Sequence, residues 1–351
     1  MKHFGTLPDG RETKLYTLSN KNGMTAEVSD FGATLVALSA PDRNGDFADL
    51  TLGFDSVEGY ASLENPYFGA TAGRVGNRIA HGRFSLDGKE YQLANNNDPG
   101  AIPCHLHGGN LGFSRRLWSV KAVSGGSITL EYVSPDGEEG YPGTLTTSVT
   151  YSLNEANELT WEASAATDAP TILNLVHHSY WNLSGRPGSS IHDHILQLQA
   201  DHYLPTDSGL IPTGELSPVA DTPMDFTRPT PIGERIAADF EALKLANGYD
   251  HCWVLAEPTL DGLAAVAKVH EPKTGRTMEV FSNQPGVQFY AGNFLDPSLS
   301  GKGGASYSPH SGFCLETENF PDAPNQPGFP SAVLRPGETY RHIMVHRFSA
   351  K

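Results

Sequence analysis

The chain has 351 residues, with 40 acidic and 24 basic residues and a formal net charge of −16. Nucleic acids and anionic membrane surfaces attract clustered Lys and Arg, so an acidic chain without a basic stripe argues against both as partners. No apolar run approaches the length of a membrane span, and residues 1–14 lack the pattern of a secretory signal. We therefore expect a cytoplasmic protein that acts on a small neutral molecule.

The composition predicts many turns and no disulfide framework. The chain contains 37 glycines and 25 prolines, whereas average usage would give about 42 of the two together. Its three cysteines, Cys104, Cys252 and Cys314, are far apart and form no Cys-x-x-Cys pair. We expect them to be small buried residues of a protein in a reducing compartment.

The segments between these turn residues mostly alternate apolar and polar residues, which is typical of half-buried strands. In chain order, the pattern predicts a short helix near 56–63, a hairpin over 83–93, strands over 145–153 and 158–165, a helix near 238–246 and a strand over 277–283. The hairpin turn falls on Asp87-Gly88, which can adopt the positive φ angles of a tight two-residue turn.

Strands follow strands from one end of the chain to the other, with no linker, composition break or repeat of fixed period. Many short antiparallel strands with little helix to cover them must pack sheet on sheet. The sequence therefore predicts an all-β fold: one large antiparallel β-sandwich domain, residues 1–351, with few short helices.

Polar residues that are unusual for their surroundings fall in five separate stretches. These are GRVGNRI (73–79), CHLHGG (104–109), LVHHSYW (175–181), NGYDHCW (247–253) with SNQPGVQFYAGN (282–293), and SGFCLETENFPDAPNQPGF (311–329). Taken one at a time, most of these polar residues have an ordinary structural explanation. An arginine beside turn glycines is usually solvated, and Asp250 suggests a turn or a helix cap. Glu316 differs, because a carboxylate flanked by Phe313 and Leu315 is expected to be partly buried and then needs a partner or a function.

The stretch 175–181 places two adjacent histidines in an apolar, aromatic run. Successive side chains of an extended strand point to opposite faces. His178 therefore shares a face with Val176 and Tyr180, whereas His177 lies on the other face, with Leu175 and Trp181. Only one of the two histidines can enter any given pocket.

Two other histidine pairs raise the question of a metal site. His105 and His107, and likewise His192 and His194, are two residues apart and would share a face of an extended strand. Neutral imidazoles and a carboxylate at this spacing could bind a metal on a β-barrel. However, no local motif supplies three ligands, Gly108-Gly109 suggests that the strand ends at His107, and 191–195 could be a surface strand.

A second chemistry needs only an acid, a base and a shaped pocket. One His and one Glu on opposite sides of a small polar ring can donate a proton to one oxygen while removing another from its neighbour. Such general acid–base transfer contributes roughly 10²–10⁴-fold. With reference pKa values near 6.5 and 4.3, each group would favour the charged form of the other in a shared site. The sequence holds no phosphate-binding glycine motif, so we expect no cofactor.

Six segments in fixed order over nearly the full chain carry a family resemblance. They are GRVGNRI, LHGG, HHSYWNL, GYDH, QPGVQFYAGNFL and HSGFCLETENFPDAPNQP, and residues 134–143 and 200–207 fit as well. Together they closely resemble the aldose 1-epimerases, the galactose mutarotases. The resemblance implies a large antiparallel β-sandwich that needs neither metal nor nucleotide and interconverts the α and β anomers of hexoses such as galactose and glucose.

The resemblance also implies roles for single residues. The catalytic acid falls on His178 and the base on Glu316, while His177 stands where relatives commonly have Asn. A further active-site histidine falls on His107, with His105 left as an extra. The residues implied to bind the sugar are Asn77, Arg78, His107, Tyr180, Asp250 and Gln284. From the tendency of ligand pockets to contain aromatic walls, Phe289 is either an apolar platform under the sugar ring or an ordinary core residue.

Three alternatives remain open at this point. The first is a non-catalytic sugar-binding protein, which could lack the acid–base pair. The second is an epimerase of phosphorylated hexoses, which needs several cationic groups for the phosphate, and Arg74 and Arg78 are the only ones near the motifs. The third is a metal-dependent β-barrel enzyme. We expect a monomer or a homodimer, and the preferred aldose is left open.

Overall fold

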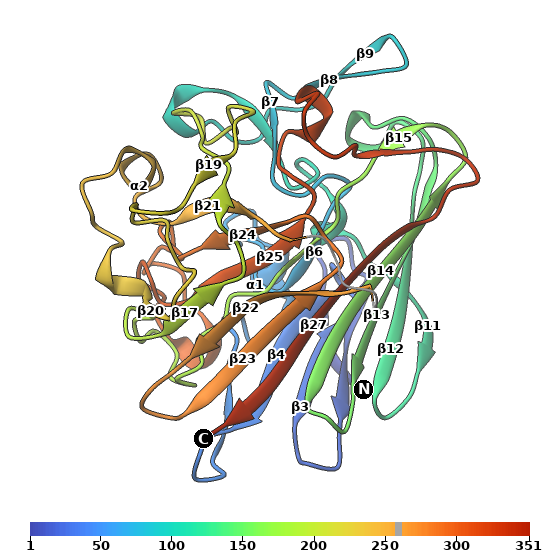
Figure 1. Cartoon of the computed structure of the whole chain (residues 1–351). Coiled ribbons are helices and arrows are strands. Elements are labelled where there is room, and N and C mark those ends of the chain that lie inside the picture. Colours follow the sequence, from blue (N-terminus) through green and yellow to red (C-terminus); the bar gives the residue numbers. More distant parts are fainter. Residues whose placement is uncertain (257–261) are drawn as a thin grey trace.

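Three large antiparallel sheets make up most of the computed structural model, which describes residues 1–256 and 262–351 (Figure 1). The first has five strands: β1 (Lys2–Thr6), β2 (Glu12–Ser19), β3 (Thr25–Ser29), β4 (Thr34–Pro41) and β5 (Phe47–Asp49). The second has nine, in the order β11 (Ser119–Val123), β12 (Ser127–Ser134), β13 (Leu145–Leu153), β14 (Glu158–Thr167), β27 (Tyr340–Ala350), β23 (Arg276–Ser282), β22 (Ala264–His270), β17 (Ile195–Leu198) and β20 (Thr230–Pro231). The third has five, in the order β19 (Ser217–Pro218), β18 (His202–Tyr203), β21 (Asp250–Val254), β24 (Gly286–Tyr290) and β25 (Cys314–Glu318).

Four two-stranded pairs, two short α-helices and six single-turn 3₁₀ helices complete the regular structure of the described residues. The pairs are β7 (Arg78–Ala80) with β10 (Cys104–Leu106), β15 (Thr171–Ile172) with β26 (Val333–Leu334), β6 (Ala70–Ala72) with β16 (Val176–His178), and β8 (Arg83–Leu86) with β9 (Lys89–Gln92); the α-helices are α1 (Val57–Ala61) and α2 (Glu241–Ala246). The predicted hairpin is β8–β9, and its turn residues Asp87 and Gly88 have φ angles of 52° and 77°. The predicted helices and strands are confirmed, with shifts of a few residues at their ends.

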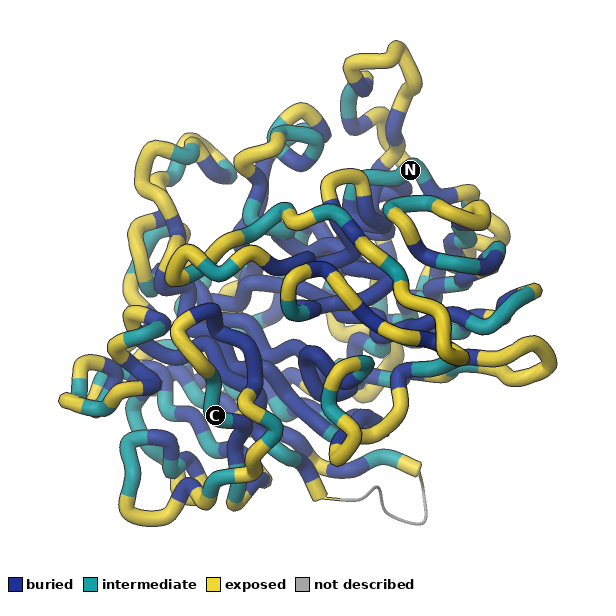
Figure 2. The backbone as a smooth tube through the Cα atoms, turned by 90° about the horizontal axis from the view of Figure 1, so that it is seen from above, coloured by how far each residue is buried: buried dark blue, intermediate teal, exposed yellow. Residues whose placement is uncertain are grey.

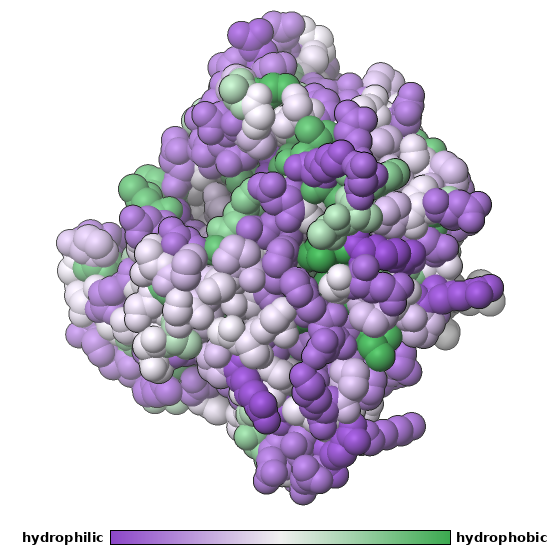
Figure 3. Space-filling model, turned by 90° about the vertical axis from the view of Figure 1, so that its left-hand side faces the viewer, coloured by the Kyte–Doolittle hydropathy of each residue, from purple (hydrophilic) through white to green (hydrophobic). Residues whose placement is uncertain are grey.

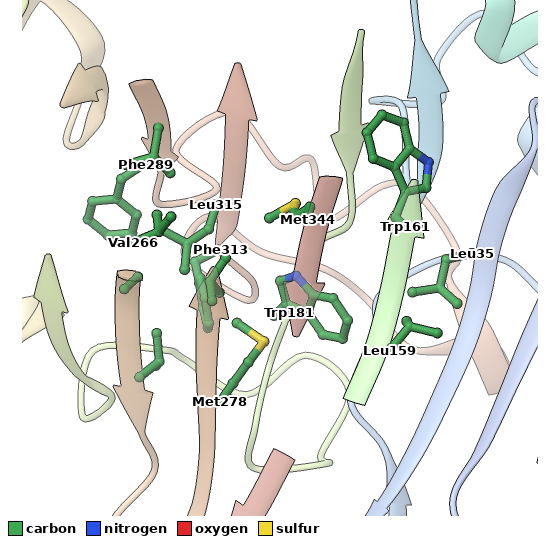
Figure 4. Packing of buried hydrophobic residues seen from close by; sticks show 14 of the residues in the cluster. Leu35, Leu159, Trp161, Trp181, Val266, Met278, Phe289, Phe313, Leu315 and Met344 are labelled. Atoms are coloured by element: carbon green, nitrogen blue, oxygen red, sulfur yellow. The ribbon is translucent and has the colours of Figure 1, made fainter. Parts of the chain in front are cut away.

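The main hydrophobic core lies between the nine-stranded sheet and the two five-stranded sheets. In β13, the apolar residues at every second position are buried, because alternate side chains of a strand point to the same face. In Figure 4, Leu35 of β4 lies near Trp161 of β14, and Phe289 of β24 lies near Val266 of β22. Buried segments fill the middle of the molecule, and exposed residues lie mostly on the peripheral loops (Figure 2). The prediction of a large antiparallel β-sandwich is confirmed.

The third sheet has two different faces, and this difference positions the functional site. Residues 253, 287, 289 and 315 are in the main core, whereas residues 250, 288 and 316 alternate with core-facing positions and are polar. The opposite face of β21, β24 and β25 is therefore free to form a polar wall outside the core.

The outer surface carries few large apolar side chains. The face drawn in Figure 3 is mostly hydrophilic, with apolar residues in small scattered groups. In the part of the chain that the structure describes, no helix is both long and apolar enough to span a bilayer. The three cysteines are buried and free of disulfide bonds, as predicted.

Candidate active site

A cavity of about 400 Å³ lies against the polar face of the third sheet. This volume falls in the usual range for small-molecule sites, roughly 300–1,000 Å³. The predicted site residues that line it are Asn77, Arg78, His107, His178, Tyr180, Asp250 and Glu316. Segments far apart in the sequence therefore meet at one cavity, as the motifs predicted.

The central wall of the cavity is formed by neighbouring strands of the third sheet. Gln288 of β24 is directly opposite Glu316 of β25, and Asp250 begins β21 on the other side of β24. Because side chains alternate along each strand, the neighbours Phe289 and Leu315 point into the core instead. The strand register thus places two carboxyl groups and an amide on one surface.

Of the two interpretations of Phe289, the structure confirms the core residue and contradicts the platform under the ligand. Its side chain is fully buried and packs against Tyr249 and Phe226, with ring centroids 5.3 and 5.7 Å away. Along β24, Phe289 points to the core face of the sheet, whereas Gln288 and Tyr290 point to the opposite face, on the side of the cavity. The aromatic residues that line the cavity are Tyr67, Tyr180, Tyr290 and Phe294.

The two adjacent histidines lie on opposite faces of β16, as predicted. His178 lines the cavity, and its ring stacks between Tyr67 and Tyr180 at centroid distances of 5.8 and 5.2 Å. His177 lies in the core, with Nδ1 3.2 Å from the Tyr151 hydroxyl and Nε2 2.8 Å from Ser179 Oγ. Of these two histidines, His178 is the one that lines the cavity and has a ring nitrogen close to Glu316.

His178 and Glu316 are adjacent on the cavity wall. His178 Nε2 is 3.5 Å from Glu316 Oε1, and both side chains are at most 5% exposed. Glu316 Oε2 has no hydrogen-bond partner among the described residues, although it is buried. A buried acceptor without a partner is unfavourable unless a ligand supplies the missing donor. The prediction that the two groups lie on opposite sides of a ligand is wrong, because β16 packs against β25.

Burial dominates the protonation of this pair. It lowers the pKa of His178 to about 4. It also raises the pKa of Glu316 well above the ordinary value, and the nearby carboxyl groups of Glu318 and Asp250 raise it further. We expected each group to favour the charged form of the other, but removing both from water favours the neutral forms. These pKa directions favour a neutral imidazole beside a carboxyl group that keeps its proton.

His107 is oriented by a backbone hydrogen bond. It follows β10 with a positive φ of 49°, and its Nδ1 accepts the backbone N–H of Asn77 at 3.1 Å. Because a backbone N–H can only donate, Nδ1 carries no hydrogen, and the neutral ring has its hydrogen on Nε2. His107 therefore offers a hydrogen-bond donor at the cavity, 4.9 Å from the His178 ring between centroids.

The same hydrogen bond decides whether these residues suit a metal ion. Nitrogen and oxygen atoms of His107, His178 and Glu316 lie within 4.8 Å of one another, which is close enough for a shared cation. A neutral imidazole that binds a metal must offer a lone pair on one nitrogen and carry hydrogen on the other. Since His107 Nδ1 accepts the Asn77 N–H, its Nε2 has no lone pair to offer. In this tautomer, His107 is a hydrogen-bond donor and does not suit a metal ion.

The histidine pairs considered for a metal do not converge. His105 is held by Tyr141 Oη and Ala94 O, both at 2.7 Å, and does not line the cavity. Residues 191–194 form a turn, not a surface strand, so His192 and His194 do not share a strand face. His194 is buried and its Nε2 accepts the Leu183 N–H at 3.0 Å. The regular strand β10 ends at Leu106, one residue earlier than expected.

The two arginines of GRVGNRI have different roles, and neither is a solvated loop residue. Arg78 lines the cavity, where its Nη1 is 3.8 Å from Asp250 Oδ2 and its Nε donates to Asn97 Oδ1 at 3.4 Å. Arg74 is 2% exposed and donates to the backbone carbonyls of residues 134, 135 and 142. Among the described lining residues, Arg78 is the only Arg or Lys, so the cavity does not suit a phosphate group well.

Asp250 forms a further polar group at the end of the cavity wall. It is the first residue of β21 and is not a helix cap. Its Oδ1 accepts the side-chain amide of Gln288 at 2.7 Å, while its other oxygen faces Arg78. Gln288 Oε1 is buried and has no partner in the described part of the chain. Asp250 therefore presents an acceptor at the cavity that ligand hydroxyl groups can use, whereas Gln288 holds Asp250 and does not itself line the cavity.

The placement of Gln284 does not agree with the prediction. Its backbone lies two residues after β23, its side-chain amide donates to Asn283 Oδ1 at 3.1 Å, and it does not line the cavity. Gln288, four residues later, holds the position beside Asp250 and Glu316. A local signal distinguished the two: Gln284 precedes Pro285-Gly286, a turn sequence, whereas Gln288 lies inside the following strand.

Comparisons with known proteins agree with the fold and identify the family. The family model described as aldose 1-epimerase matches residues 14–347. Galactose mutarotase of Homo sapiens is 46% identical over 99% of this chain and 97% of its own length, and aldose 1-epimerase of Escherichia coli K12 is 36% identical over 98% and 97%. The crystal structure of an aldose epimerase homologue from C. elegans has a TM-score of 0.87 at 32% identity, covering 96% of this chain and 99% of that one.

The all-β sandwich and the buried His–Glu pair in a cavity define a class of acid–base enzymes or sugar-binding proteins on a mutarotase-like scaffold. The family model and the relatives match nearly the whole chain, with sequence identity up to 46%, and this narrows the class to one family. This chain belongs to the aldose 1-epimerase family.

Proposed function

We propose that this protein is an aldose 1-epimerase, an isomerase that interconverts the α and β anomers of hexoses such as D-galactose and D-glucose. The observation that carries the proposal is the contact between His178 Nε2 and Glu316 Oε1, 3.5 Å apart on the wall of the cavity. The ring oxygen and the anomeric hydroxyl of a hexose are bonded to the same carbon. Adjacent acid and base groups can therefore serve both oxygens at once.

The reaction needs one proton donor and one proton acceptor. Glu316, as a carboxylate, accepts the proton of the anomeric hydroxyl, while protonated His178 donates a proton to the ring oxygen. The C1–O5 bond breaks and gives the open aldehyde. Rotation about C1–C2 presents the other face of the carbonyl, and the two residues reverse their roles to close the ring as the opposite anomer.

The buried pair already holds the single proton that this reaction uses. A neutral imidazole with a protonated carboxyl group has the same number of protons as an imidazolium with a carboxylate, so transfer within the pair converts one into the other. A sugar hydroxyl placed against Glu316 Oε2 would give that oxygen the donor it lacks and stabilise the carboxylate. Substrate binding thereby favours the reactive form.

The other lining residues divide into donors, acceptors and an aromatic wall. The donors are His107, through Nε2–H, and Arg78, which can stabilise negative charge on the sugar oxygens. Asp250 accepts hydrogen bonds from hydroxyl groups. Tyr180 contributes its ring to the wall, since its own hydroxyl donates to the carbonyl of Pro66 at 3.0 Å.

Polarimetry tests the proposal. Freshly dissolved α-D-galactose and α-D-glucose should approach their equilibrium rotation faster when the purified protein is present, in proportion to its concentration. Sugar binding without acceleration would instead support a non-catalytic sugar-binding protein. Metal analysis and a chelator control belong to the same experiment, because activity that disappears on chelation and returns with a divalent ion would support the metal-dependent alternative.

We also propose that the chain is a single domain that works in the cytoplasm. One observation supports the single domain: the main core combines residues of all three large sheets. The free, buried cysteines support a reducing compartment. Limited proteolysis that yields stable fragments would contradict the first statement, and cell fractionation tests the second.

A further inference from the structure

A second carboxyl group, Glu318, lies next to the cavity without lining it. It follows Glu316 by two residues on β25, so both side chains leave the same face of the strand. Glu318 is 0% exposed, and no Lys or Arg in the described chain forms a salt bridge with it. A fully buried carboxyl group without a cationic partner is costly, so its contacts need an explanation.

Two asparagine amides bind the Glu318 carboxyl group. Asn77 Nδ2 donates to Oε1 at 3.0 Å, and Asn174 Nδ2 donates to Oε2 at 3.4 Å. The orientation of both amides is fixed, because Asn77 Oδ1 accepts the Arg78 N–H and Asn174 Oδ1 accepts the Asn319 N–H. Both asparagines must therefore present NH₂ groups, and residue 318 must accept on both sides. A carboxyl group can do this, whereas a glutamine amide would face one of the NH₂ groups with its own.

The Asn77 contact connects Glu318 to the cavity. Asn77 lines the cavity in a left-handed conformation with φ of 57°. Its backbone N–H is the group that holds His107 Nδ1 and determines which nitrogen of that ring carries the hydrogen. By fixing the Asn77 side chain, Glu318 supports two of the proposed sugar-binding residues from outside the cavity.

The charge of Glu318 also acts on Glu316. The titratable and charged groups that interact with Glu318 from the elements around it are Glu316, Asp250, Arg78, Cys252 and Tyr340. Burial raises the pKa of Glu318 to about 8, against the opposing effect of the two asparagine amides. An ionised Glu318 opposes ionisation of Glu316, and it does so from the same face of one strand.

We propose that Glu318 is a positioning residue that holds Asn77 and His107 against the sugar and, through its charge, sets the pH range in which Glu316 acts as a base. The second part rests on the proposed function. The first part concerns binding and does not depend on turnover.

The test compares Glu318→Gln with the wild type in three measurements between pH 5 and pH 9. These are kcat and KM by polarimetry, D-galactose affinity by calorimetry, and the midpoint of thermal unfolding. The matched control is Glu271→Gln, which changes a buried carboxyl group in the β22–β23 turn, outside the cavity, where it accepts the N–H groups of Lys273 and Thr274.

For Glu318→Gln, we expect KM and the galactose dissociation constant to rise roughly three- to tenfold, the effect of one lost buried hydrogen bond. The acidic limb of the kcat/KM profile should move to lower pH by at least about half a unit near and above pH 8, where Glu318 is ionised and its like charge opposes ionisation of Glu316. Glu271→Gln should change the unfolding midpoint and leave KM and the pH profile unchanged. An acidic limb that coincides with the wild type overturns the proposal.

The thermal measurement separates this proposal from the proposed function. A carboxyl group whose folded pKa is raised stabilises the fold fully below its unfolded pKa, and this contribution is lost as pH rises through the folded value. The wild type should therefore lose stability relative to Glu318→Gln between about pH 5 and pH 8. This holds even if no sugar is turned over. A stability difference that stays constant over that range, or unchanged galactose affinity, contradicts the role of Glu318 itself.

Discussion

His177 and His178 are adjacent in the chain and similarly buried, yet they lie in two different regions of the molecule. Burial lowers the pKa of both below the ordinary value. In the core, both ring nitrogens of His177 are within hydrogen-bond distance of protein hydroxyl groups. In the cavity, His178 Nε2 faces a carboxyl group at 3.5 Å, one oxygen of which has no partner among the described residues. A buried histidine thus indicates chemistry only when the polar groups around it have hydrogen-bonding capacity left for a ligand.

The largest expected effect comes from removing the base on the cavity side. Glu316→Gln keeps the size of the side chain and removes the acceptor of the anomeric proton. We expect the mutarotation rate to fall by roughly 10²–10⁴-fold. The fold should be retained, because no hydrogen bond of this carboxyl group within the described residues is lost. Polarimetry and circular dichroism check the two statements, and a variant with full activity would exclude Glu316 as the base.

The paired variants His178→Asn and His177→Asn test the comparison directly. The first should lower the rate by about 10²–10³-fold, because the proton donor to the ring oxygen is lost. The second should leave the rate within about threefold and lower the free energy of unfolding by about 1–3 kcal/mol, because buried contacts to Tyr151 and Ser179 are lost. Urea titration and polarimetry on both proteins separate the effects. If His177→Asn were the inactive variant, the assignment of the strand faces would be wrong.

Acid should destabilise the core through its buried histidines. Burial lowers the pKa of His342 and of His346 on β27 to about 3. The unfolded chain, with values near 6.5, binds more protons between those limits, so stability is complete above about pH 6.5 and falls as pH decreases. The slope is about 1.4 kcal/mol per pH unit for each such histidine.

His346→Leu isolates one of these contributions. Both ring nitrogens of His346 are buried without a partner in the described chain, so an apolar residue removes its titration without breaking a hydrogen bond. Urea denaturation at pH 7, 6 and 5 should show that the free energy of unfolding of the variant falls less steeply with decreasing pH than that of the wild type. The difference in slope should correspond to about one proton fewer taken up on unfolding. Equal slopes in the two proteins would show that His346 does not titrate on unfolding in this range.

The sequence was sufficient wherever the relevant physics is local. Alternation along a strand correctly placed His178 and His177 on opposite faces, and Asp87-Gly88 correctly marked the hairpin turn. The apolar neighbours of Glu316 correctly indicated burial. These predictions depend only on the period of a strand, on turn conformations and on the neighbours of a residue.

The remaining features depend on contacts between distant segments. The position of Gln288 beside Glu316 follows from the register between β24 and β25, which no local pattern gives. The interpretation of Phe289 as a platform was wrong for the same reason. Which face of β24 points into the core is known only once the sheet is assembled. The pKa directions of His178 and Glu316 were reversed because the degree of burial, which outweighs their mutual attraction, is a property of the whole fold.

The smallest expected effect concerns Gln288 and Gln284, of which only Gln284 was named from the sequence. Gln288→Leu keeps a similar shape and removes the amide that donates to Asp250 at 2.7 Å. Without it, the Asp250 carboxylate is less well oriented for sugar hydroxyl groups, so KM should rise by roughly three- to tenfold with little change in kcat. Neither glutamine lines the cavity, but Gln284 donates to Asn283 and not to Asp250, so Gln284→Leu is the matched control and its KM should equal that of the wild type. The reverse pattern would mean that Gln284, and not Gln288, supports sugar binding.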